Sequence, residues 1–126
     1  NVRYKIFIEY DVDTTLAKPI YLNVAYLENI LSSFIEQSCM DIIKKELKKG
    51  KIQKQIDVNV SVSKSNISLV VKNNGFEVKN IYNLYLSDVD NKAILEAKNL
   101  ANMLNAKFEI ITLENEGMQY SLNIKI

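Results

Sequence analysis

Apolar and polar residues alternate with a period of two in several separate segments of this chain, and this pattern strongly restricts its fold. In Val2–Tyr10 almost every second residue is apolar, and Ile56–Val62 and Met118–Ile126 follow the same rule. Such alternation is typical of strands with one buried face. Ile67–Lys72 differs because it contains the apolar run Leu69–Val71, which predicts a strand buried on both faces.

Two other segments repeat apolar residues at steps of three and four, which predicts amphipathic helices. The longer helix begins after Asn23, a suitable cap, and ends at Gly50, a common stop. The positions that form its stripe are Leu27, Leu31, Phe34, Ser38 and Ile42. The second helix covers residues 93–104. Phe108–Thr112 then pairs with the last strand around the turn Glu114–Gly117.

The predicted order is therefore β-α-β-β-(short)-α-β-β. Each helix has one apolar stripe, so both are expected to pack on the same face of one sheet. We predict an α+β fold, a two-layer α/β sandwich with a mixed, mostly antiparallel sheet and with Val2–Tyr10 at its edge. The 126 residues fit a single domain over 1–126. Because the chain starts at Asn1 and not at Met, we expect it to be cut from a longer protein.

Composition excludes several classes of function. The net charge of +1 indicates neither nucleic-acid binding nor attraction to membranes, and no apolar run is long enough to span a bilayer. The single cysteine, Cys39, rules out an internal disulfide and fits a reducing, cytoplasmic location. Histidine is absent, which removes the commonest general base, the commonest metal ligand and any phosphate-accepting histidine. We therefore expect no catalytic residue and no metal site.

Short motifs add a resemblance that covers nearly the whole chain. The segments are Leu27–Ser38, Asn73–Glu77, Ile81–Tyr85, Asn91–Leu95 and Gly117–Tyr120. In that order they resemble the N box (L-x-Q-V-L-x-N-L-L-x-N-A), the G1 box (D-N-G-x-G), the F box (I-F-x-x-F), the G2 box (G-L-G-L) and the closing G-T-x-F of the GHKL ATPase family. The histidine-kinase branch of that family is the most similar. The resemblance implies the ATP-binding fold of that family and implies that this chain is the C-terminal part of a longer protein.

The departures from the family pattern fall on the residues that handle the nucleotide. Gln37 replaces the asparagine that binds Mg²⁺ in the family, and Ser33 replaces the first N-box asparagine. Asn73 replaces the aspartate that accepts a hydrogen bond from the adenine amino group, and Glu77 replaces the second G1 glycine. By resemblance, the remnant of the nucleotide site consists of Ser33, Gln37, Asn73, Gly75, Glu77, Asn91 and Ala93.

These replacements predict poor nucleotide binding. Asn91 and Ala93 stand where glycines let the backbone approach phosphates, and Glu77 places a negative charge beside them. A few losses of roughly 1–2 kcal/mol each would move a micromolar site toward millimolar. We therefore expect no cofactor, with only weak binding of ATP and Mg²⁺ left open.

Several of these residues also have simpler interpretations. Glu36 and Gln37 are expected to face solvent or a wet cleft, and Asn73–Gly75 taken alone is a strand-ending turn. The lysines of residues 44–54 could meet phosphates or an acidic partner, but a solvated helix end that complements the helix dipole is commoner. Cys39 is expected to be inert packing.

Three functional hypotheses follow. The first is a degenerate histidine-kinase-like domain that docks or supports phosphotransfer in two-component-type signalling. The second is an active ATP-binding domain of a divergent sensor histidine kinase, and the third is an unrelated α/β binding module. The resemblance implies two partners, an upstream helical dimerisation and phosphotransfer hairpin and a response regulator. Candidate contact residues are Tyr82, Tyr85 and Leu86, because large apolar groups on a short irregular segment are costly to expose.

Overall fold

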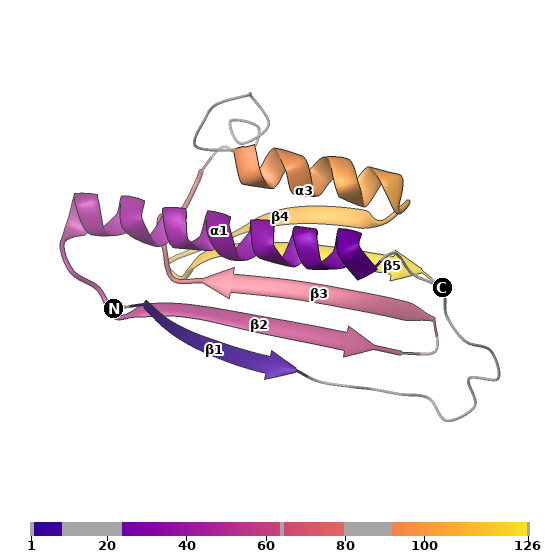
Figure 1. Ribbon diagram of the computed structural model, residues 1–126. Coiled ribbons are helices and arrows are strands. Elements are labelled where there is room, and N and C mark those ends of the chain that lie inside the picture. The colour runs from indigo at the N-terminus through magenta and orange to yellow at the C-terminus, as the bar shows by residue number, and fades with distance from the viewer. Residues whose placement is uncertain (1, 9–23, 64, 80–91, 126) are drawn as a thin grey trace.

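The computed structural model describes residues 2–8, 24–63, 65–79 and 92–125, and its elements follow the predicted order (Figure 1). The elements are β1 (Val2–Ile8), α1 (Val24–Lys49), β2 (Lys54–Val62), β3 (Asn66–Asn73), α3 (Lys92–Met103), β4 (Lys107–Leu113) and β5 (Gly117–Lys125). The proposed cap Asn23 and the proposed strand end Tyr10 lie outside the described residues.

The strands form one five-stranded sheet in the order β1-β2-β3-β5-β4. β1 pairs with β2 in parallel, and the other three neighbouring pairs are antiparallel. The parallel pair follows from the connection, because the chain passes from β1 to β2 through α1 and a crossover of that kind joins parallel strands. The prediction of a mixed, mostly antiparallel sheet with its first strand at an edge is therefore confirmed.

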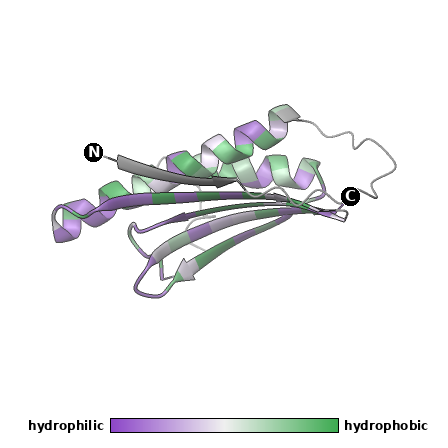
Figure 2. Ribbon diagram, turned by 90° about the horizontal axis from the view of Figure 1, so that it is seen from below, coloured by the Kyte–Doolittle hydropathy of each residue, from purple (hydrophilic) through white to green (hydrophobic). Residues whose placement is uncertain are grey.

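Both helices lie on the same side of the sheet, as the two views in Figures 1 and 2 show. The period-two alternation places apolar side chains of β2, β3 and β5 on that side, where they meet α1 and α3. Fully buried members of this core are Phe34, Ile42, Ile56, Val71, Ala97, Met118 and Tyr120. The α+β sandwich with helices on one face is thus confirmed.

The second face of the sheet corrects one prediction. Leu69 and Val71 are buried toward the helices, but Ser68 and Val70 on the other side are only half-buried and Lys72 is exposed. The expectation that this strand is buried on both faces is therefore wrong. The reason is that both described helices cover the same side, so the apolar run gains one buried face and not two.

The end of α1 agrees with the sequence. Gly50 has φ +81°, and its N–H donates to the Glu46 carbonyl at 2.9 Å, which is the left-handed termination that glycine favours. Among the described residues, no helix is both long and apolar enough to cross a membrane.

Candidate functional site

A cluster of buried polar side chains lies where α1 crosses the end of β3. Buried polar side chains need hydrogen-bond partners, because each unpaired polar group away from water destabilises the folded state by about 1–3 kcal/mol. The polar side chains that are buried in the described residues are Ser33, Gln37, Ser38, Asp41 and Asn73. The first four come from successive turns of α1, so they share the helix face that meets the sheet.

Asp41 is the centre of this cluster. Its Oδ2 accepts hydrogen bonds from Tyr120 OH and from Asn73 Nδ2, the latter at 3.1 Å, and its Oδ1 accepts one from Gln37 Nε2 at 3.3 Å. Asn73 Nδ2 also donates to Ser38 Oγ at 3.0 Å. Asp41 is only 1% exposed. Side chains from α1, β3 and β5 therefore surround a buried acid.

Burial dominates the electrostatics of this acid. It raises the pKa of Asp41 to about 6 from its usual 3.8, because the charged form is poorly solvated in the core. Hydrogen bonds from Tyr120, Asn73 and Gln37 and the positive charge of Lys44 lower the pKa, but they do not offset burial. The pKa of Tyr120 is raised in turn, first by its own burial and then by the charge of Asp41.

Gln37 corrects a second prediction. It is fully buried, so the expectation that it faces solvent or a wet cleft is wrong. Its amide nitrogen contacts Asp41, while its Oε1 is a buried oxygen with no hydrogen-bond partner. Gln37 is buried because it lies four residues before Asp41, so both side chains lie on the apolar stripe of α1.

The loop after β3 is pressed against α1. Asn73 Oδ1 accepts the Gly75 N–H at 2.8 Å, and the Phe76 N–H donates to the Asp41 carbonyl at 2.8 Å. A Cβ on Gly75 would lie 2.6 Å from the Ile42 nitrogen, a distance that side chains do not adopt. Gly75 is therefore required by its contact with the helix backbone.

Gly117 plays a similar role on the other side of the loop. It has φ +134°, and a Cβ there would lie 2.8 Å from the Asn73 carbonyl carbon. Gly75 and Gly117 are the two glycines that agree with the family pattern. In this structure Gly75 packs against the backbone of α1, and Gly117 packs against the backbone of Asn73 and Asn74.

The remaining predicted site residues are dispersed. Ser33 is buried one turn before Gln37, and Ala93 is buried in the first turn of α3. Glu77 lines a groove of about 540 Å³ at the end of α1, together with Gly75 and Lys45. Asn91 and the proposed contact residues Tyr82, Tyr85 and Leu86 lie outside the described residues.

Sequence analysis missed Ser38, Asp41 and Tyr120 as partners in this cluster. Ser38 and Tyr120 were expected to be buried, but no role was assigned to them. The available signal was Asp41 itself, an acid four residues after Gln37 on the apolar stripe. Within the described ranges, no three His, Cys, Asp or Glu residues lie together as a metal site would require.

Comparison with known proteins places the fold. No protein-family model matches the sequence, and no curated protein sequence matches it. Among solved structures, the chain is similar to the blue-light activated histidine kinase of Erythrobacter litoralis EL346, with a TM-score of 0.62 and 11% sequence identity. The match covers 94% of this chain and 35% of that chain, so this chain spans about a third of the kinase. The chain therefore shares its fold with part of a histidine kinase.

Proposed function

We propose that this chain is a histidine-kinase-type ATPase-like domain of the GHKL family that no longer binds Mg-ATP at physiological concentration. In this proposal it acts as a docking, scaffold or phosphotransfer-support module of a two-component-type signalling protein. Its partners are an upstream helical dimerisation and phosphotransfer hairpin and a response regulator. Support for the family comes from the motif resemblance together with the shared fold.

One observation carries the loss of nucleotide binding. Asn73 stands where the family uses an aspartate to accept the adenine amino group, and it is 4% exposed. Its oxygen accepts from Gly75, and its nitrogen donates to Ser38 and Asp41. An incoming base would have to displace these bonds and uncover Asp41, at a cost of about 1–3 kcal/mol for each polar group left unpaired.

Gln37 supports the same conclusion for the metal. Its side chain is buried and its amide nitrogen is bound to Asp41. To bind Mg²⁺ through Oε1 it would have to leave the core, whereas Mg²⁺ keeps most of its waters and needs an open position. The buried cluster therefore occupies the residues that the family uses to hold the base and the metal.

The test is a titration with Mg-ATP followed by thermal unfolding. Stabilisation by a ligand follows RT ln(1 + [L]/Kd), so a millimolar site gives less than about 1 kcal/mol at millimolar ATP. We expect a shift of the melting temperature too small to separate from that given by Mg²⁺ with pyrophosphate. A shift of many degrees with Mg-ATP that Asn73→Ala abolishes would contradict the proposal and identify an active nucleotide site.

A further inference from the structure

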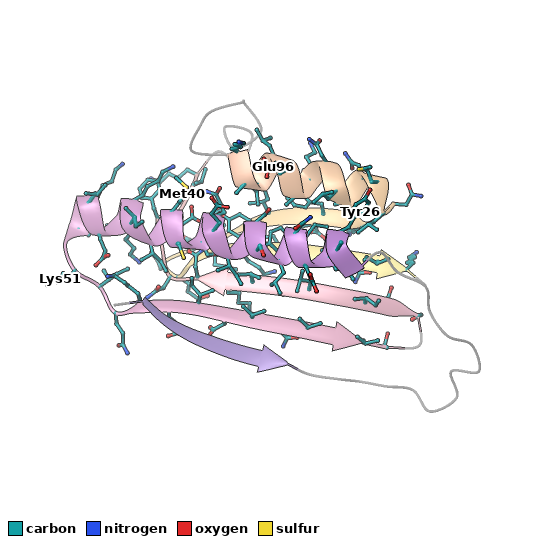
Figure 3. The ribbon with its side chains drawn as sticks, in the orientation of Figure 1. Tyr26, Met40, Lys51 and Glu96 are labelled. Atoms are coloured by element: carbon teal, nitrogen blue, oxygen red, sulfur yellow. The ribbon has the colours of Figure 1, made fainter. Side chains whose placement is uncertain are left out.

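Lysines gather at the C-terminal end of α1. Residues 44–54 contain six lysines and one glutamate, a net charge of +5 in a chain whose net charge is +1. The helix dipole accounts for Lys48 and Lys49 in the last turn. It does not account for Lys79, which belongs to the segment after β3. Figure 3 labels Lys51 just beyond the end of α1, which marks this end of the molecule.

The lysines here surround a concave surface. Lys45, Lys49 and Lys79 line a groove of about 540 Å³ together with Gly75–Val78 and Asn115. This volume falls within the range of about 300–1,000 Å³ that is usual for sites that take small groups. Glu77 is the one acid in the lining, so the groove is positive overall.

The positive charges of the groove are not neutralised by the described residues. The ion pairs Lys54–Glu46 and Lys107–Glu109 include no lysine of the groove. Lys45 Nζ donates to the Asn74 carbonyl at 3.0 Å, a contact that fixes the side chain but leaves its charge unpaired. Lys48 Nζ lies 4.4 Å from the centre of the Phe76 ring. Side chains that are already held lose less entropy on binding.

The wall of the groove formed by residues 76–79 is also fixed. The Phe76 N–H donates to the Asp41 carbonyl at 2.8 Å, and the Val78 N–H donates to Met118 Sδ at 3.4 Å. The Thr112 hydroxyl donates to the Val78 carbonyl. The groove therefore lies between the end of α1 and a segment after β3 that is held by hydrogen bonds to α1, β4 and β5.

We propose that this groove docks an acidic segment of a partner protein, whose carboxylates pair with Lys45, Lys49 and Lys79. This inference rests on the proposed docking function and specifies the chemistry of the partner. A flat bilayer would touch the rim of a concave site and not its lining. The net charge of +1 gives no broad basic surface for a nucleic-acid backbone.

The test uses a short fluorescein-labelled peptide of alternating glutamate and serine, with binding followed by anisotropy and by amide chemical shifts. The groove variant is Lys49→Gln with Lys79→Gln, since both side chains are exposed. The matched control is Lys72→Gln with Lys125→Gln. These two exposed lysines lie on β3 and β5, and neither of them lines the groove. Thermal unfolding of both variants verifies that they fold.

We expect the peptide to shift the amides of residues 45–49 and 76–79. Each lost lysine should weaken binding about two- to fivefold, while the control leaves it nearly unchanged. Salt above about 0.1 M should weaken binding further, because these contacts are exposed.

Three results would overturn the proposal: no binding, equal loss in both variants, or shifts elsewhere on the chain. Binding to anionic vesicles or to a DNA duplex at these amides, without binding to the peptide, would exclude an acidic protein as the occupant. Failure of the peptide experiment leaves the Mg-ATP titration unaffected. The inference and the proposed function can therefore fail separately.

Discussion

Replacing Asp41 by asparagine should stabilise this protein at neutral pH, against the usual result of changing a buried, fully bonded side chain. Burial raises the pKa of Asp41 from 3.8 to about 6. A shift of one unit corresponds to 1.36 kcal/mol, so keeping the carboxyl charged in the folded state costs about 3 kcal/mol. Asparagine has nearly the same shape without that charge.

The direction of the pH dependence follows from the raised pKa. Well below pH 3.8, Asp41 is protonated in the folded and unfolded states alike, and its charge costs nothing. As the pH rises from 3.8 to about 6, the unfolded chain loses this proton while the folded chain keeps it, so the folded state loses stability. Above that range the full cost of about 3 kcal/mol is present. The wild type and Asp41→Asn should therefore differ most at neutral pH and least in acid.

The hydrogen bonds allow this substitution. Tyr120 and Asn73 donate to Oδ2, and an asparagine oxygen in that place accepts both. The new amide nitrogen would face Gln37, whose amide can turn so that Oε1 accepts. The turn exchanges the present bond from Gln37 Nε2 for one to Oε1, which has no partner in the wild type, so the number of hydrogen bonds between the two side chains is unchanged.

The measurement is the free energy of unfolding by urea for both proteins at about pH 4 and about pH 7. We expect the variant to gain about 2 kcal/mol relative to the wild type between these values, because a small part of the full cost is already present at pH 4. Other titrating groups cancel in the difference. Asp57→Asn, at a half-buried position on β2, is the control for loss of one negative charge. An Asp41→Asn protein that is less stable at neutral pH than in acid, relative to wild type, would refute the reasoning.

Two further changes test the same region. Gly75→Ala should cost roughly 1–3 kcal/mol and remove the hydrogen-exchange protection of the Phe76 amide, because the new methyl group meets the backbone of α1. Gly50→Ala, where nothing lies within 4 Å, should leave that amide protected, and equal loss in both variants would argue against the packing role. Tyr120→Phe removes a hydrogen bond that lowers the pKa of Asp41, so the carboxyl should titrate at higher pH by carbon-13 NMR. An unchanged titration would exclude Tyr120 as a donor in solution.

The local patterns of the sequence were sufficient for most of the fold. Ile56–Val62 is part of a strand because its side chains alternate, and α1 ends at Gly50 because only glycine readily takes φ +81° there. Both signals depend on neighbours within a few residues. The apolar run Leu69–Val71 misled the prediction, since a run without alternation does not say which faces other elements will cover.

The candidate site was predictable only in part. The motif resemblance identified Asn73, Gln37 and Gly75, and the structure brings Asn73 and Gln37 together on Asp41. The structure adds a close contact of Gly75 with the helix backbone, which the resemblance does not predict. Sequence patterns do not predict how closely the backbone at Gly75 approaches the backbone of α1.

By itself, the sequence determined the elements and their order and predicted a single domain, because these depend on periodicities of 2 and 3.6 residues. Only the tertiary structure decided that Asp41 becomes the buried centre of the polar cluster. Its partners Asn73 and Tyr120 stand 32 and 79 residues away along the chain. No local pattern encodes such a contact, and the pKa of Asp41 is set by the loss of water that results when three elements close around it.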